Sequence, residues 1–449
     1  MPDLFDFQRD GAEYLAGSVG FKLLHWDMGV GKTPTAIRAL DRVEATSALI
    51  LCPAVACRNW AREIEAWAQT ERSVQVLSKG SDEITGEIVI ASYNMAIRTT
   101  VASRLRARKW DVVVLDEIQY LKSMTSMRTK VVLGFGVFRG QGLVEDAGHV
   151  WGLTGTPAPN NLSEMYPWLR ACAPATVTTV ESTRPMSYKN FLMLYTRGFD
   201  TPFGWRITGN NKDTLPLLTR KIDPYRHRVR KKDVLQDLPP MRIVQVEVDG
   251  DALADRARML AAEHAKQILG VLEGGALNAH VATVRRLLEE AKVPAAIDMV
   301  QSELADMAYE KVIVFAHHRD AIDQFAIGLK GYGVSVVNGG VTGTRRQAAI
   351  DEFHEGINRV FVGQIQAAGT AITLHAHGAC SNIVALSADW VPANNAQAYA
   401  RIHRHGQPNG VLVRVLHLAG SIDEHVNRTL IGKTRMLDEI FEGELEDVA

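Results

Sequence analysis

Residues 21–40 read FKLLHWDMGVGKTPTAIRAL, which is a short apolar run, a glycine-rich turn and a helical pattern in direct succession. Glycines let backbone N–H groups turn toward a triphosphate, and the first turn of a helix adds positive potential there. Lys32 is placed to reach the β and γ phosphates, and the Thr33 hydroxyl to bind Mg²⁺. The stretch therefore predicts a nucleotide-binding loop. The full pattern GxxxxGK[ST] is not met, because Trp26 stands at its first glycine, and an ordinary glycine-rich turn is the alternative.

Apolar runs of strand length alternate with amphipathic helical patterns on either side of a central, less regular part of the chain. The first series comprises 47–54, 87–92, 111–117 and 149–157; the second comprises 311–318, 333–340, 359–364, 381–388 and 411–418. Continuous apolar runs are typical of parallel strands that are covered on both faces. The pattern predicts an α/β protein of two tandem parallel-sheet lobes, 1–235 and 236–449.

Each lobe carries an expected insertion. Residues 160–235 look like mixed helix and loop and end in a basic run, whereas residues 250–305 have a strong helical pattern. The pair Pro239–Pro240 between them continues neither a helix nor a strand, so it marks the best boundary between the lobes.

Composition excludes several classes of protein. Hydrophobic residues make up 46% of the 449 residues, the formal net charge is −1, and four scattered cysteines show no CxxC spacing. A disulfide framework or a zinc site is therefore not expected. The acidic start lacks the features of a signal peptide, and no apolar stretch has the length of a membrane span. We expect a cytoplasmic protein, bacterial or virus-encoded and acting in the host cytoplasm, with no membrane partner.

Two acids close the apolar run at 111–117. Asp116 is placed to bind Mg²⁺ through water, and Glu117 to orient and deprotonate an attacking water. A solvent-facing acidic strand end is the alternative, but the phosphate loop earlier in the chain favours the chemical interpretation. The small-residue turn 153–157, LTGTP, gains its interest from following this strand.

A basic pair stands in the second lobe within QAYARIHRHGQ, residues 397–407. Arg401 and Arg404 are three apart on an expected helix and would share one face. Two guanidiniums on one face suit a γ-phosphate whose charge grows in the transition state. A solvated basic helix is the alternative.

Taken in order, these stretches resemble the Swi/Snf-type superfamily 2 ATPases. The resemblance runs from about residue 7 to about residue 426 and rests on FQRDGAEYL, DMGVGKT, LILCPAVACRNWAREIEAW, DEIQ, LTGTPAPNNLSEMY, VVNGGVTGTRRQAAIDEFHEG, AAGTAITL, ADWVPANNAQA and RIHRHGQ. It implies two RecA-like lobes of the P-loop NTPase helicase core with helical insertions. It also implies ATP hydrolysis in the cleft between them, with ATP and Mg²⁺ as cofactors, and translocation along double-stranded DNA.

The resemblance assigns roles in the first lobe. Gln8 matches the glutamine that reads adenine, and Asp116 and Glu117 match the metal-binding and water-activating acids. Thr154 and Thr156 match the motif that couples hydrolysis to movement. The phosphate loop is matched by Gly29, Val30, Gly31, Lys32 and Thr33, of which Lys32 is expected to be catalytic and Thr33, with Asp116, to hold Mg²⁺.

It also assigns roles in the second lobe. Arg401 and Arg404 match the catalytic arginine-finger motif, and Gln407 matches its closing glutamine. Gly369 matches a glycine turn that senses both the DNA backbone and the nucleotide.

Four positions depart from the family pattern. Trp26 replaces a small or acidic residue before the phosphate loop and could alter access to the nucleotide. Gln119 stands where histidine is common, which puts the strength of coupling to DNA in doubt. Ala371 and Thr373 replace a glycine and an asparagine of the DNA-contacting motif. The phrase QAAGTAITL and the compact length look closest to the annealing-helicase branch.

The leading hypothesis is a DNA-dependent ATPase that moves along double-stranded DNA and remodels protein–DNA complexes or branched DNA. Basic runs at 98–109 and 220–232 are candidate contacts to phosphates, which would give binding without sequence preference. Such runs are also found on ordinary solvated faces. A strand-separating DNA or RNA helicase and a DNA-binding adaptor that does not hydrolyse ATP are the alternatives, while protein partners, pathway and oligomeric state stay open.

Overall fold

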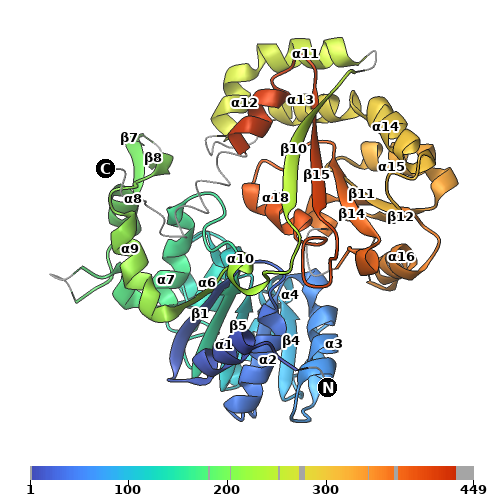
Figure 1. Ribbon diagram of the computed structural model, residues 1–449. Helices are drawn as coiled ribbons and strands as arrows, with labels where there is room; N and C mark the ends of the chain where they lie inside the picture. The colour runs from blue at the N-terminus through green and yellow to red at the C-terminus, as the bar shows by residue number, and fades with distance from the viewer. Residues whose placement is uncertain are drawn as a thin grey trace. The chain divides into compact units, whose positions relative to one another are not determined.

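The computed structural model describes residues 3–179, 183–202, 204–250, 253–272, 279–341, 343–368 and 373–430. The chain forms two compact units that meet in sequence between Gln236 and Asp237. Each unit has its own parallel sheet with helices packed on it (Figure 1). The predicted α/β fold with two parallel-sheet lobes is confirmed.

The first unit contains a seven-stranded sheet in the order β3-β4-β2-β5-β6-β1-β9, with every pair parallel. The strands are β1 (Gly20–Trp26), β2 (Ala48–Cys52), β3 (Val74–Val76), β4 (Ile88–Ser92), β5 (Val112–Asp116), β6 (His149–Thr154) and β9 (Arg226–Val229). The helices are α1 (Asp6–Ala16), α2 (Lys32–Arg42), α3 (Cys57–Trp67), α4 (Tyr93–Ala96), α5 (Thr99–Ala107), α6 (Met127–Leu133), α7 (Tyr166–Cys172), α8 (Tyr188–Tyr195), α9 (Leu215–Ile222) and α10 (Lys231–Val234).

The register brings the functional ends of the strands together. All five residues of β2 are buried, as expected of a central strand covered on both faces. His25 of β1 lies beside Thr154 of β6, and Leu153 lies beside Asp116 of β5. Three motifs from distant parts of the sequence therefore end at one edge of the sheet, where open α/β sheets bind their ligands.

The region expected as mixed helix and loop, 160–235, contains more strand than its sequence indicates. An antiparallel hairpin of β7 (Thr196–Thr201) and β8 (Gly204–Asn210) lies outside the main sheet, at the end of α8 (Figure 1). The basic run then supplies β9, which lies beside β1 at the edge of the sheet that the described residues form. An edge strand needs no continuous apolar run, because one of its sides has no neighbouring strand.

The second unit contains a six-stranded parallel sheet in the order β10-β15-β14-β11-β13-β12. Its strands are β10 (Met241–Val248), β11 (Lys311–Ala316), β12 (Val334–Val337), β13 (Val360–Gln364), β14 (Cys380–Ala385) and β15 (Val411–Leu418). Its helices are α11 (Ala254–Glu263), α12 (Ala265–Leu272), α13 (Ala279–Glu290), α14 (Val293–Ala305), α15 (Arg319–Gly328), α16 (Gly343–Glu355), α17 (Ile365–Ala368) and α18 (Pro392–Tyr399).

Two apolar cores cover the two faces of this second sheet. One includes α11, α13 and α18, and the other includes α14 and α15. The junction of α13 and α14 is fixed by Lys292, which is fully buried and forms an ion pair with Asp423 while donating to Ser387 Oγ at 2.9 Å. Across the described residues, no helix combines the length and the apolar character that crossing a membrane requires.

Candidate functional site

The loop between β1 and α2 has the backbone shape of a phosphate cradle. Gly29 and Gly31 have φ values of 83° and 88°, in the left-handed region that glycine adopts without strain. A Cβ atom on Gly31 would lie 2.2 Å from Gln8 Nε2, so a larger residue does not fit. Because Gly31 directly precedes α2, the N–H groups of the first helical turn face the loop, which favours an anion.

Lys32 lies over this loop. Its Nζ donates to the carbonyl oxygens of Trp26 at 2.9 Å and Asp27 at 3.1 Å, at the carboxyl end of β1. Thr33 follows in the first turn of α2 and is half-buried. An ammonium and a hydroxyl so placed beside a glycine turn fit a Mg²⁺-bound triphosphate.

Gln8 connects α1 to the loop. Its Nε2 donates to the carbonyl of Val30 at 3.0 Å, and its Oε1 accepts from the N–H of Phe5 at 3.0 Å. A carboxamide has two donors and two acceptor lone pairs, so these bonds use half of its capacity. Gln8, which the resemblance predicts to read adenine, is thus hydrogen-bonded to the phosphate loop.

Trp26 is accommodated in the core rather than over the loop. Its ring is fully buried, its Nε1 donates to His227 Nδ1 at 2.9 Å, and its ring centroid lies 5.7 Å from that of Phe7. A Cβ atom on Gly11 of α1 would lie 2.3 Å from the indole. The ring thus fills the space between α1 and β9, and the backbone carbonyl of Trp26 accepts from Lys32.

Asp116 is partly buried at the end of β5. Its Oδ2 accepts from Trp60 Nε1 at 2.8 Å, and its carbonyl accepts from the Tyr93 hydroxyl at 2.9 Å. Burial, together with the adjacent charge of Glu117, raises the pKa of Asp116 to about 7, against the lowering effect of the bond from Trp60. A divalent cation would favour the ionised form, so this carboxylate and the Thr33 hydroxyl fit a Mg²⁺ ion that also binds phosphate oxygens.

A chain of hydrogen bonds links Glu117 to the small-residue turn after β6. Gln119 Nε2 donates to Glu117 Oε2 at 2.6 Å, and Gln119 Oε1 accepts from Thr154 Oγ1 at 2.7 Å. Thr154 Oγ1 in turn accepts from the N–H of Thr156 at 2.9 Å. Gln119, which departs from the family pattern, therefore joins the expected water-activating acid to the expected coupling motif.

The backbone of Glu117 is itself unusual. Its φ is 52° and its ψ is 57°, a left-handed conformation that costs a non-glycine residue of order 1 kcal/mol or more. Strained residues of this kind persist where the surrounding structure holds them, and they cluster at functional sites.

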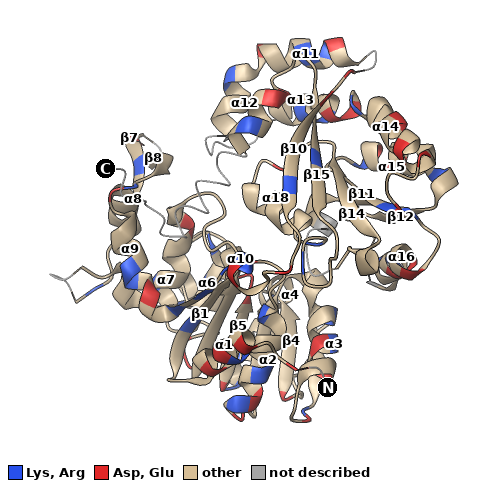
Figure 2. Cartoon of the chain, viewed as in Figure 1, with Lys and Arg blue, Asp and Glu red and all other residues tan. Residues whose placement is uncertain are grey.

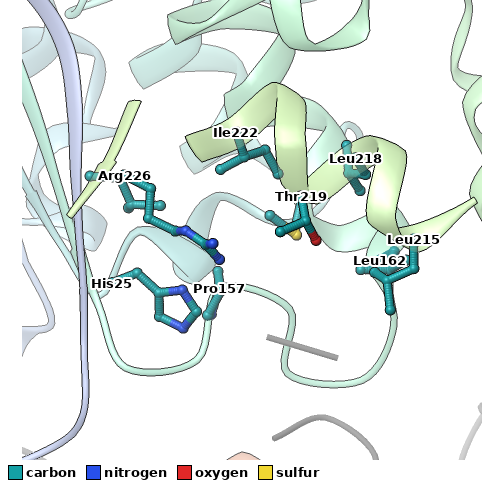
Figure 3. Close-up of a pocket in the computed structure, with 10 residues that line it drawn as sticks. His25, Pro157, Leu162, Leu215, Leu218, Thr219, Ile222 and Arg226 are labelled. Atoms are coloured by element: carbon teal, nitrogen blue, oxygen red, sulfur yellow. The ribbon is translucent and has the colours of Figure 1, made fainter. Parts of the chain in front are cut away.

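An apolar pocket lies beside the turn that carries Thr154 and Thr156. It is lined by Leu23, His25, Pro157, Leu162, Met165, Leu215, Leu218, Thr219, Ile222 and Arg226. Figure 3 shows the side chains of α9 facing Pro157 and Leu162 across this space. Burial, aided by nearby arginines, lowers the pKa of His25 well below its usual range, so its imidazole is neutral. The pocket is thus a packing contact between the turn and α9.

In the second unit, the prediction of a helix over 397–407 is wrong for most of that range. Helix α18 ends at Tyr399, and Arg401 and Arg404 follow in irregular backbone rather than on one helical face. Arg401 Nε donates to the carbonyl of Gln397 at 3.1 Å, and the Arg401 carbonyl accepts from the N–H of Leu374 at 2.8 Å. These two bonds satisfy carbonyl groups that a longer helix would have used, as is usual at a helix end.

The residues around these arginines have structural partners. Arg404 Nη1 donates to Thr373 Oγ1 at 2.6 Å. Gln407 Nε2 donates to the carbonyl of Cys380 at 2.8 Å, while its Oε1 accepts from the N–H of Asn409. Gln407 therefore fixes this loop to β14. Gly369 and Ala371 lie outside the described residues.

Sequence reasoning missed a buried polar cluster at the carboxyl end of β11. Glu289 of α13 accepts from the backbone N–H groups of His317 and His318, at 2.7 and 3.1 Å, and contacts His318 Nδ1 at 3.1 Å. His317 Nδ1 lies 3.7 Å from Asp389 Oδ2. The double histidine directly after the apolar run 311–316 was the available signal.

The basic runs are less open than their sequences indicate. Within 220–232, Arg228 pairs with Asp27 at 2.6 Å and Arg230 with Asp233 at 2.6 Å. Within 98–109, Arg104 donates to the carbonyl of Asp82 at 2.8 Å and Arg106 to a carbonyl at 2.7 Å. Lys and Arg are interspersed with Asp and Glu over both units (Figure 2). These arginines stabilise local structure, whatever else they contact.

Two family models match the chain. The SNF2-related domain matches residues 8–255, and the Helicase conserved C-terminal domain matches residues 295–406. The first match contains the phosphate loop, both acids and the turn after β6, and the second contains the two arginines.

Several known proteins are similar to the chain over almost its whole length. A SWI/SNF-related matrix-associated actin-dependent regulator of chromatin subfamily A-like protein 1 from Xenopus tropicalis is 26% identical over 97% of this chain and 44% of its own length. The DNA annealing helicase and endonuclease ZRANB3 of Mus musculus is 26% identical over 99% of this chain and 41% of its own. The chain thus spans less than half the length of these relatives.

Among solved structures, the Sulfolobus solfataricus SWI2/SNF2 ATPase core in complex with dsDNA is 20% identical, with 99% of this chain and 94% of that chain covered and a TM-score of 0.45. The family assignment rests on the models. Because the SNF2-related model matches more than half of the 449 residues, the chain belongs to the SNF2-related family.

Proposed function

We propose that this chain is an ATP-dependent double-stranded DNA translocase that remodels protein–DNA complexes or branched DNA. One observation carries the proposal. Lys32 contacts the carboxyl end of β1, and Asp116 and Glu117 lie at the carboxyl end of β5, on the same edge of the sheet. Gln119 joins Glu117 to Thr154 by hydrogen bonds of 2.6 and 2.7 Å. This arrangement supports a site for nucleotide hydrolysis in the first unit. It also supports a connection from that site to the turn after β6.

In this proposal the glycine turn and Lys32 bind the triphosphate of ATP. Glu117 holds the attacking water, because its carboxylate is fixed by Gln119. Mg²⁺, held by Thr33 and Asp116, would neutralise phosphate charge. When the γ-phosphate leaves, the surroundings of the Glu117 carboxylate change. The hydrogen bonds through Gln119 connect that change to Thr154 and Thr156. Arg401 and Arg404 are proposed to stabilise the γ-phosphate as its charge grows.

Double-stranded DNA as the partner is supported by membership of the SNF2-related family and by the printed name of one relative, a DNA annealing helicase. Contacts to phosphates rather than base edges would make binding independent of sequence and sensitive to salt. The complete set of Lys32, Asp116, Glu117, Arg401 and Arg404 favours hydrolysis over the role of a non-hydrolysing adaptor.

The experiment that tests the proposal measures phosphate release with and without duplex DNA, and then displacement of a third strand from the major groove. Duplexes of any sequence should stimulate hydrolysis, and added salt should weaken the stimulation. Third-strand displacement should require ATP and should vanish in Lys32→Ala, whereas a plain forked duplex should stay paired. Efficient unwinding of the fork would favour a strand-separating helicase, and ATP turnover that ignores DNA would overturn the proposal.

A further inference from the structure

The β7–β8 hairpin presents one face of mixed aromatic and basic character. Phe199 and Arg206 are cross-strand partners, so their side chains share a face, and the guanidinium lies 6.0 Å from the ring centroid. Arg206 and Thr208 are exposed, as is Phe199 at 51%. Arg197, near the base of the same hairpin, is exposed too and pairs with Asp213 at 3.5 Å.

The other face of the hairpin is packed and is joined to α8 by a hydrogen bond. The Trp205 ring covers Gly198, where a Cβ atom would lie 2.7 Å from Trp205 Nε1. That nitrogen donates to Thr196 Oγ1 at 3.1 Å, and Thr196 donates to a carbonyl of α8 at 2.6 Å. Since a lone two-stranded hairpin is marginally stable in water, this anchoring accounts for its order. Phe199 lies on the opposite face and takes part in neither of these hydrogen bonds.

The base of the hairpin is joined to the coupling turn. Asn210, the buried last residue of β8, accepts through Oδ1 from the N–H of Leu162 at 3.0 Å. Leu162 and Pro157 line the apolar pocket together with Leu215 and Leu218 of α9, the helix that follows the hairpin (Figure 3). The hairpin is therefore hydrogen-bonded to a segment that packs beside the turn carrying Thr154 and Thr156.

We infer that the exposed face of this hairpin binds unpaired bases where a DNA duplex ends in single strands. Phe199 would stack on a base, and Arg197 and Arg206 would meet the flanking phosphates. A paired duplex hides the faces of its bases, whereas a branch point exposes them, and aromatic side chains stack on any base without sequence preference. This inference rests on the proposed action on DNA and names the DNA structure that the protein prefers.

The test compares a forked and a blunt duplex of the same sequence, the fork carrying 2-aminopurine at its first unpaired position. The full chain should quench the fluorescence of 2-aminopurine and bind the fork more tightly than the blunt duplex. Phe199→Ala should lose the quenching and roughly fivefold or more of the affinity for the fork, while stimulation of ATP turnover by blunt duplex stays unchanged. Phe199→Trp should keep both properties.

Val137→Ala is the matched control, since Val137 is an apolar residue of the same unit that is 85% exposed. It should behave as the unsubstituted protein. Asn210→Ala should keep the quenching but lose the extra ATP turnover that a fork induces over a blunt duplex.

Three outcomes would overturn the inference: no quenching by the unsubstituted protein, full fork preference in Phe199→Ala, or equal losses in Val137→Ala. A protein partner on this face would give the first of these. If no DNA stimulates ATP turnover, the proposed function fails separately, and the quenching still decides the role of the hairpin.

Discussion

Gln119 donates a hydrogen bond to the Glu117 carboxylate at 2.6 Å, although only one residue separates the two in sequence. The short reach is possible because Glu117 adopts a left-handed backbone conformation at the end of β5. Gln119 is buried, so its amide has few alternatives to Glu117 and Thr154. The orientation of the Glu117 carboxylate is therefore set by Gln119, which is also hydrogen-bonded to Thr154 before the turn after β6.

Gln119→Ala should lower the rate of ATP turnover with little change in ATP affinity. A hydrogen bond to a charged group contributes about 1.5–3 kcal/mol, which corresponds to a loss of roughly ten- to hundredfold in kcat. Steady-state kinetics and equilibrium binding of an ATP analogue measure the two effects. Gln141→Ala, at an exposed site, is the control. A kcat within twofold of the original would show that Glu117 does not depend on this contact.

Lys32→Ala and Glu117→Gln should fail in different ways. Removing the Lys32 ammonium should abolish ATP binding and hydrolysis, because the β and γ phosphates lose their positive partner. Glu117→Gln should still bind ATP but should turn over about 10²- to 10⁴-fold more slowly. Binding and single-turnover measurements separate these results, with the exposed Lys79→Ala as control. Near-normal turnover in Glu117→Gln would mean that another group activates the water.

Arg404→Ala should impair turnover far more than nucleotide affinity. Its charge is needed mainly as the γ-phosphate departs, and arginines in this role contribute roughly 10³- to 10⁵-fold. Arg404→Lys should recover little, because an ammonium lacks the planar pair of donors. Arg428→Ala, which breaks an exposed pair with Glu424, should leave turnover unchanged. Equal losses in affinity and turnover for Arg404→Ala would argue for a role in holding Thr373 alone.

Glu289→Gln should destabilise the second unit in a pH-dependent way. Burial alone would raise the pKa of Glu289, but the bond from His318 and the positive surroundings lower it to about 2. Burial also lowers the pKa of His317 to about 4, so at pH 7 His317 acts through its backbone N–H rather than through ring charge. A folded-state pKa below the ordinary value means that the carboxylate stabilises the fold above about pH 4.5.

That contribution should be lost as the pH falls from about 4.5 toward 2. At pH 7 the substitution should lower the free energy of unfolding by about 2 kcal/mol, and the difference should shrink at pH 3.5. Urea denaturation of the full chain at both pH values tests this. Glu424→Gln, which affects an exposed pair with Arg428 in the same unit, should have a small effect. A difference that does not change with pH would contradict the assignment.

The sequence predicts the central strands well because burial on both faces demands continuous apolar residues. The expected strand 411–418 has the bounds of β15, and 359–364 differs from β13 by one residue. The edge strands β9 and β10 were not predicted, since each has a single neighbour and carries exposed or polar side chains. The β7–β8 hairpin was missed for a similar reason, as it buries only one face.

The candidate site was predictable as a set of residues but not as a set of contacts. The glycine turn and the two acids are local patterns, and their placement follows from the strand ends. The end of α18 at Tyr399 depends on Leu374, twenty-five residues earlier, which local periodicity does not record. The hydrogen bond from Gln119 to Glu117 likewise depends on the left-handed backbone of Glu117. The neighbouring sequence does not predict that conformation.

The pairing of β1 with β9 affects the order in which the first unit can fold during synthesis. The Asp27 side chain at the end of β1 is bound by Arg228 and by the N–H of Lys231, which are synthesised about two hundred residues after it. Contacts so distant in sequence form slowly and only after their partners exist. A nascent chain halted before residue 226 would have its glycine turn without the strand that secures it. The loop of the nucleotide site is thus synthesised well before the strand that completes its surroundings, so we expect a chain that ends before β9 to hydrolyse ATP poorly.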